Sequence, residues 1–175
     1  MKKTYLVLQI VVLTLCYQCI NAQEQNQSNY NGWEFLSWKC KKTEAENILN
    51  KKGIEYSNEE SYDSTRTIIK FEYDELDTRL YFDTLSQLND IKQQQEFSVI
   101  YDKESKIFFE KVKKSLLLKY GKAKEEKNDK EKEVITILWK LKYAVINLTF
   151  DYKYKIIDEF GCCAYKIEIN FSQVK

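Results

Sequence analysis

The balance between helical and strand periodicity constrains this fold more than any other feature of the sequence. Only two segments, 41–52 and 107–120, have apolar residues at helical spacing, and a glycine follows each of them, Gly53 and Gly121. About six segments instead show the alternation that is typical of β-strands. Because two helices cannot cover both faces of so many strands, we expect both helices on one face of an antiparallel sheet and nothing on the other.

The strands are expected in two groups of about three, one after each helix. The segments are 66–73, 80–82, the end of 88–100, 134–141, 143–157 and 165–171. This order predicts an α+β fold of two helix-plus-three-strand repeats, 33–103 and 104–175, that form one antiparallel sheet with the helices packed on one face. The run 122–133 has ten charged residues in twelve and predicts an exposed loop or frayed helix end. We interpret Gln93 to Gln95 as part of a solvated face.

The first 22 residues have the layout of a secretory signal peptide. Lys2 and Lys3 precede an apolar run of twelve residues, 5–16, and the segment closes on the small residue Ala22. The run is shorter than the roughly 20 residues needed to span a bilayer. We expect cleavage near Ala22, a flexible leader at 23–32, no transmembrane segment in the mature chain, and a secreted or periplasmic location.

Composition argues against nucleic-acid binding and against most catalytic chemistry. The formal net charge is +1, so no excess of basic residues would attract nucleic acid. The chain has no histidine, the usual general base and metal ligand, and its four glycines are too scattered to form a phosphate-binding loop. No pair among its 27 acidic residues is marked by an apolar setting. We therefore expect a protein that is not an enzyme and uses no cofactor or metal.

Three of the five cysteines remain after signal cleavage: Cys40, Cys162 and Cys163. In an oxidising compartment they allow one disulfide and one remaining thiol. Pairing Cys40 with Cys162 or Cys163 would close a loop that the chain-entropy model credits with roughly 4–5 kcal/mol. A redox role for the adjacent pair is a weaker alternative, because the two cysteines lack the two-residue separation of redox motifs. The cysteines in the signal, Cys16 and Cys19, are not preceded by the small residue expected before a lipid-modified cysteine.

The order of these motifs resembles a known group of exported proteins. The segments that carry the resemblance are 38–53, 116–122, Trp139 and 146–148. They resemble small exported proteins of uncharacterised function in Gram-negative bacteria, similar in architecture to tandem repeats of the β-lactamase-inhibitor-protein type and to the small lipoprotein of the outer-membrane barrel-assembly machinery. The resemblance implies units of helices followed by antiparallel strands, and a function in binding other proteins. The Trp-Gly pair that usually opens the first helix is absent, since Lys39 follows Trp38.

Our leading functional hypothesis is an exported, non-catalytic protein-binding or scaffold module whose partner is another envelope or extracellular protein. Its binding surface would be the uncovered sheet face. Candidate positions on that face are Tyr143, Lys153, Lys166 and Glu168. The alternative is a small-ligand or glycan-binding protein that uses exposed aromatic side chains of the open face. Trp33, Trp38 and Trp139 would then form a stacking platform, whereas in the first hypothesis they pack in the core.

Overall fold

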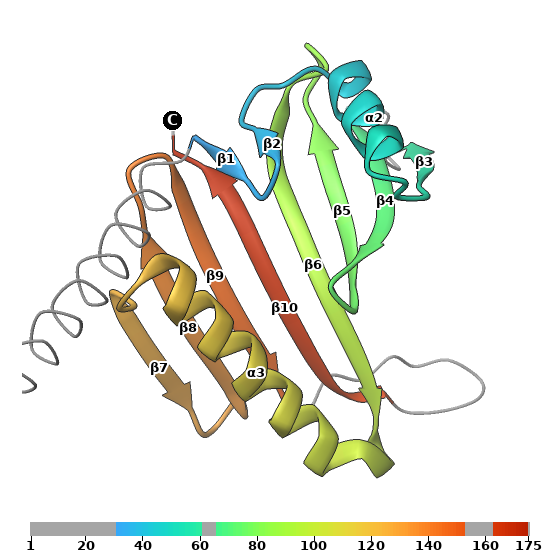
Figure 1. The fold of residues 1–175 in the computed structure, drawn as a ribbon. Coiled ribbons are helices and arrows are strands. Elements are labelled where there is room, and N and C mark those ends of the chain that lie inside the picture. The colour runs from blue at the N-terminus through green and yellow to red at the C-terminus, as the bar shows by residue number, and fades with distance from the viewer. Residues whose placement is uncertain (1–30, 61–65, 153–162, 175) are drawn as a thin grey trace, which may run out of the picture.

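A computed structural model of the chain describes residues 31–60, 66–152 and 163–174 (Figure 1). The expected signal peptide and most of the leader lie outside these ranges. The helices are α2 (Lys42–Lys51) and α3 (Asp102–Tyr120), and a short 3-10 helix, η1 (Val99–Tyr101), precedes α3. The strands are β1 (Gly32–Trp33), β2 (Leu36–Ser37), β3 (Ser57–Glu60), β4 (Thr67–Tyr73), β5 (Leu76–Phe82), β6 (Leu88–Ser98), β7 (Glu125–Asp129), β8 (Val134–Lys140), β9 (Ala144–Asp151) and β10 (Cys163–Gln173).

Eight of these strands form a single sheet that dominates the molecule. Their order across the sheet is β3-β4-β5-β6-β10-β9-β8-β7, and every neighbouring pair is antiparallel. The last strand in the sequence, β10, therefore lies in the middle of the sheet, between β6 and β9 (Figure 1). The short strands β1 and β2 form a separate hairpin. The prediction of an antiparallel sheet is confirmed.

The predicted fold of two helix-plus-three-strand repeats, 33–103 and 104–175, is wrong. The described chain is one eight-stranded sheet with a small two-stranded hairpin and only two α-helices. The prediction lacked the short strands β1 and β2 and, within the eight-stranded sheet, the two edges β3 and β7, whose sequences are SNEE and EEKND. The two edge strands carry no apolar alternation, because an edge strand has one neighbour and its polar side chains protect the free edge from pairing with another chain. Five of the twelve residues at 122–133, which we expected to form an exposed loop or frayed helix end, form β7.

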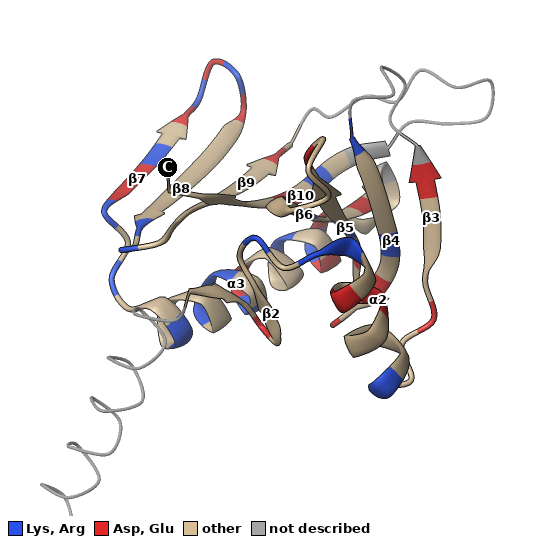
Figure 2. Cartoon of the chain, turned by 90° about the horizontal axis from the view of Figure 1, so that it is seen from above, with Lys and Arg blue, Asp and Glu red and all other residues tan. Residues whose placement is uncertain are grey.

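Both helices lie on the same face of the sheet (Figure 2). Helix α2 buries Ala45 and Leu49 against the sheet, and α3 buries Phe109, Val112 and Leu116. The Phe109 ring stacks on Phe150 of β9 with 4.8 Å between ring centroids. Within the described ranges no helix combines the length and apolar character that crossing a membrane requires.

The two glycines predicted to end the helices do so. Gly53 follows α2 with a φ of 68°, and the amide of Ile54 donates to the carbonyl of Leu49 at 3.0 Å. Gly121 follows α3 with a φ of 74°. Both values lie in the left-handed region, where glycine is favoured because it has no Cβ. The helix boundaries predicted at these two points are confirmed.

All three tryptophans are core residues, with exposed fractions of 1% for Trp33, 4% for Trp38 and 1% for Trp139. Trp33 packs edge-on against Phe171 of β10, with ring centroids 6.2 Å apart, and so holds the β1–β2 hairpin against the sheet. The interpretation that the three tryptophans pack in the core is therefore correct. A sugar-stacking platform cannot be built from side chains that solvent does not reach.

Candidate functional site

The strand register places an ordered pattern of charge on the sheet face opposite the helices. Lys70, Arg79 and Lys92 lie directly opposite one another on β4, β5 and β6. The row continues through two amide side chains, Asn170 of β10 and Asn147 of β9. Like charges in opposite positions on neighbouring strands destabilise a sheet unless anions separate them.

Carboxylates of the neighbouring row provide that separation. On the β4–β5 side, Asp77 lies 3.6 Å from the Lys70 amine and 3.5 Å from the Arg79 guanidinium. Further along, Arg66 and Asp90 form an ion pair of 3.6 Å. These pairs are partly exposed and contribute little stability each. Their effect is to hold the long side chains in a fixed pattern.

Glu168 of β10 is the most strongly held carboxylate of this face. Its Oε2 accepts from the Lys92 amine at 2.8 Å and from Lys166 at 2.9 Å, and its Oε1 accepts from the Asn170 amide at 2.8 Å. Burial on its own would raise the pKa of Glu168. The hydrogen bonds from Lys92, Asn170 and Lys166 outweigh that effect and lower the pKa to about 2.

The structure brings together two of the four residues predicted to form a binding face. Lys166 and Glu168 are neighbours on the uncovered face. Tyr143 lies in the turn between β8 and β9, half-buried, with the Lys142 amine 4.8 Å from its ring centre. Lys153 lies outside the described residues. Tyr81 is the one aromatic side chain that the register of the described strands places on this face, so the glycan-binding alternative has little to stack on.

The structure also separates two of the cysteines considered for a disulfide, Cys40 and Cys163. The Cys40 carbonyl accepts from the amide of Leu88 at the start of β6, whereas Cys163 is opposite Ser98 at its end. Ten residues of strand span about 33 Å, and disulfide-linked Cα atoms lie within about 7 Å. A Cys40–Cys163 bridge is therefore incompatible with this sheet, and Cys162 lies outside the described residues. The Cys40 thiol is buried and free; burial, with Glu44 adding to the effect, raises its pKa to about 11.

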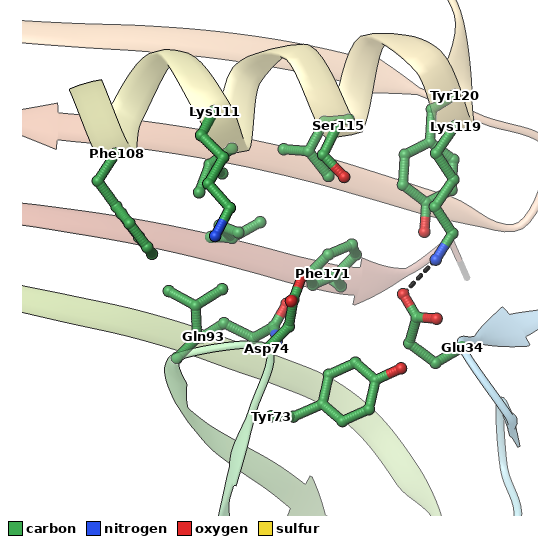
Figure 3. Close-up of a pocket in the computed structure, with 14 residues that line it drawn as sticks. Glu34, Tyr73, Asp74, Gln93, Phe108, Lys111, Ser115, Lys119, Tyr120 and Phe171 are labelled. Atoms are coloured by element: carbon green, nitrogen blue, oxygen red, sulfur yellow. Dashed lines mark hydrogen bonds and ion pairs between the residues drawn. The ribbon is translucent and has the colours of Figure 1, made fainter. Parts of the chain in front are cut away.

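The helix-covered side contains a feature that the sequence did not predict: a cavity of about 130 Å³ between α3, the β4–β5 turn and the β1–β2 hairpin (Figure 3). Most of its wall is apolar. The apolar wall consists of Leu76, Phe108, Val112, Leu116, Ile169 and Phe171. The turn that borders it is the two-residue loop Asp74–Glu75, in which both residues have positive φ, 53° and 67°. Such turns match the twist of an antiparallel hairpin.

Two ion pairs connect α3 to the loops on either side of the cavity mouth. The Lys111 amine lies 2.6 Å from the Glu75 carboxylate in the β4–β5 turn. The Lys119 amine pairs with Glu34 in the β1–β2 hairpin, as the dashed line in Figure 3 shows. Tyr73 is beside the second pair, and burial, then the Glu34 carboxylate, raise the pKa of its hydroxyl. The tyrosine is therefore protonated at neutral pH.

One polar side chain in the cavity wall is buried: Gln93 of β6, which is 5% exposed. Its Nε2 donates to the hydroxyl of Thr78 at 3.1 Å, and that hydroxyl donates to the Leu76 carbonyl at 3.2 Å. Such a bond matters because burying a polar group without a partner costs about 1–3 kcal/mol. Since Gln93 is buried on the core side of the sheet, the prediction that it lies on a solvated face is wrong. Its alternation with Ile91, two residues earlier on β6, was the signal in the sequence that places it on the core face.

Comparisons with known proteins do not assign this chain to a family. No protein-family model, no curated protein and no solved structure matches this chain. Among the residues that the structure describes, no three histidine, cysteine or acidic side chains are grouped so as to hold a metal ion.

Proposed function

We propose that this chain is an exported, non-catalytic module that binds another envelope or extracellular protein through the uncovered face of its eight-stranded sheet. The observation that carries the proposal is the charged row Lys70–Arg79–Lys92, with Asp77 and Glu168 fixed beside it. A wide face with both signs of charge in fixed positions suits recognition of a surface with the complementary pattern.

This pattern of fixed charges is suited to selecting one partner more than to strong nonspecific binding. Charged groups arranged to complement a partner mainly set which partner binds and how fast, and they repel partners with the wrong pattern. Side chains already held by neighbours lose little freedom when a partner arrives. Glu168, which accepts three hydrogen bonds, is held in this way.

Site-specific photo-crosslinking tests the proposed surface. A photoreactive phenylalanine derivative replaces Tyr81 on the uncovered face, and in a control it replaces Lys114, an exposed residue of α3. In an envelope extract we expect a discrete protein adduct from position 81 and none from position 114. An adduct from position 114 alone, or from neither position, would contradict the proposal.

A charge exchange separates recognition from folding. In the double variant K92E/E168K the two side chains keep opposite charges, so the direct pair across β6 and β10 can still form. The charge pattern presented to a partner is nevertheless inverted. We expect the adduct from position 81 to be lost. A lysine at position 168 also loses the bonds from Lys166 and Asn170, so the melting temperature should fall, and an unchanged circular dichroism spectrum at the temperature of the experiment is the control for folding. An unchanged adduct would show that the partner does not recognise this charge pattern.

A further inference from the structure

The amide of Gln93 is held in one orientation by its neighbours. The Thr78 hydroxyl has a single hydrogen, which it donates to the Leu76 carbonyl, so its oxygen must accept from Gln93. The group facing Thr78 is therefore the NH₂ of Gln93. If the amide were turned over, the Thr78 hydroxyl would have to donate to Gln93 and would lose its bond to the Leu76 carbonyl, so the orientation with two hydrogen bonds is favoured. The carbonyl oxygen Oε1 is left to accept a hydrogen bond. None of the hydrogen bonds between described residues reaches it, and it is not one of the fully enclosed unpaired side-chain atoms.

This acceptor belongs to a side chain that is 95% buried and lines the cavity under α3 (Figure 3). Protein interiors pair nearly all of their buried polar atoms. An unpaired acceptor on a buried side chain that lines a largely apolar cavity therefore suits a ligand that brings a hydrogen-bond donor and an apolar body.

The volume of the cavity limits the size of that body. Drug-sized ligands occupy pockets of roughly 300–1,000 Å³, whereas a cavity of about 150 Å³ is known to hold benzene. At about 130 Å³ the cavity accepts a single ring. Phe108 and Phe171 supply aromatic wall on two sides, which suits a ring packed edge to face.

The charges at the mouth decide between neutral and anionic ligands. Two carboxylates, those of Glu34 and Asp74, line the cavity together with the amines of Lys111 and Lys119. Lys119 is engaged by Glu34, and Lys111 by a third carboxylate outside the lining, Glu75, so the five groups together carry one net negative charge. A carboxylate or phosphate ligand would meet net negative charge outside and a carbonyl acceptor inside. A neutral ligand with a hydrogen-bond donor is not repelled by the carboxylates at the mouth, and it can donate to the carbonyl oxygen of Gln93.

We propose that the cavity beneath α3 is a binding site for a small neutral ring alcohol of the phenol type. The ring lies among Phe108, Leu116 and Phe171, and the hydroxyl donates to Oε1 of Gln93. This site is on the opposite side of the sheet from the proposed protein-binding face and does not depend on it.

Binding of three probes of one size tests the proposal: phenol, toluene and benzoate, each titrated into the isotopically labelled protein and followed by NMR. We expect phenol to shift the side-chain amide of Gln93 and the methyl groups of Leu76, Val112 and Leu116, and to bind at least about tenfold more tightly than toluene. Benzoate should not bind. No phenol binding at 10 mM, equal affinities for phenol and toluene, or shifts confined to other parts of the molecule would each overturn the proposal.

Two variants locate the site. Gln93→Met keeps the length of the side chain and removes the acceptor, so the preference for phenol over toluene should disappear while toluene still binds. Val112→Phe fills the cavity and should abolish binding of both. A Gln93→Met protein that still prefers phenol would overturn the role of Gln93. The measurement on unmodified protein keeps the proposal testable if either variant fails to fold.

Discussion

The indole N–H of Trp139 in β8 donates a 2.9 Å hydrogen bond to the carbonyl oxygen of Gly121 at the end of α3. The last carbonyls of a helix have no partner within the helix, and here a core side chain from the sheet supplies one. The other two tryptophans differ in this respect. The indole nitrogens of Trp33 and Trp38 are buried without a hydrogen-bond partner among the described residues.

This difference predicts unequal costs for the same substitution. Trp139→Phe loses aromatic packing and the bond to Gly121, and should lower the free energy of unfolding by about 2–4 kcal/mol. Trp38→Phe loses similar volume but no hydrogen bond, and should cost about 1–2 kcal/mol. Urea denaturation of both variants measures the difference. Equal losses would show that the indole–carbonyl bond contributes nothing net.

The low pKa of Glu168 predicts an acid-sensitive contribution to stability. A carboxylate whose pKa falls from 4.5 to about 2 on folding stabilises the fold above pH 4.5, and this contribution is lost as the pH falls through 2. The stability difference between the native protein and Glu168→Gln should therefore shrink by roughly 2–3 kcal/mol between pH 6 and pH 2. Chemical denaturation across this range measures it. A difference that does not change with pH would contradict the shifted pKa.

Gly53 offers a test of backbone conformation without side-chain clashes. A Cβ at this position would meet no heavy atom within 4 Å, so the cost of Gly53→Ala comes from its φ of 68° alone. We expect a loss of about 1 kcal/mol, and a smaller loss for Gly53→Asn, because asparagine tolerates the left-handed region. The control is Lys51→Ala, two residues earlier at the end of α2, where the helical backbone suits alanine and little change is expected. Equal thermal stability for alanine at both positions would refute the strained conformation at Gly53.

The Cys40 thiol should be chemically silent in the folded protein. With a pKa of about 11, only about one molecule in a thousand carries the thiolate at pH 8, and the side chain is buried as well. In a variant with Cys40 as its only cysteine, labelling by a thiol reagent at pH 8 should require unfolding. Denaturant should therefore accelerate labelling by orders of magnitude. Rapid labelling in native buffer would show that the site opens readily.

The sequence predicted those parts of the fold in which apolar periodicity coincides with burial. The alternation of Ile69 and Phe71 in β4 and the glycine after each helix were sufficient to place these elements. The edge strands β3 and β7 were not predictable in this way, because strands with one neighbour and a polar surface have the composition of loops. This is why the strand count, and with it the repeat plan, was wrong.

The candidate sites show the same limit. Lys166 and Glu168 were assigned correctly to the open face because they alternate with the buried Ile167 and Ile169. Residue type misled the interpretation of Gln93, which we assigned to solvent although its position relative to Ile91 placed it inside. The ion pairs from α3 to Glu34 and Glu75 connect residues 85 and 36 positions apart, and no local pattern encodes such contacts.

The central position of β10 has a consequence for the order in which the molecule can form. As a ribosome makes the chain, β6 and β9 emerge before the strand that must lie between them. Each has an unpaired edge until residues 163–173 arrive, so the sheet closes only after this segment has emerged. A nascent or truncated chain without this segment would consist of two strand groups with exposed inner edges, a state open to proteases and to wrong pairing.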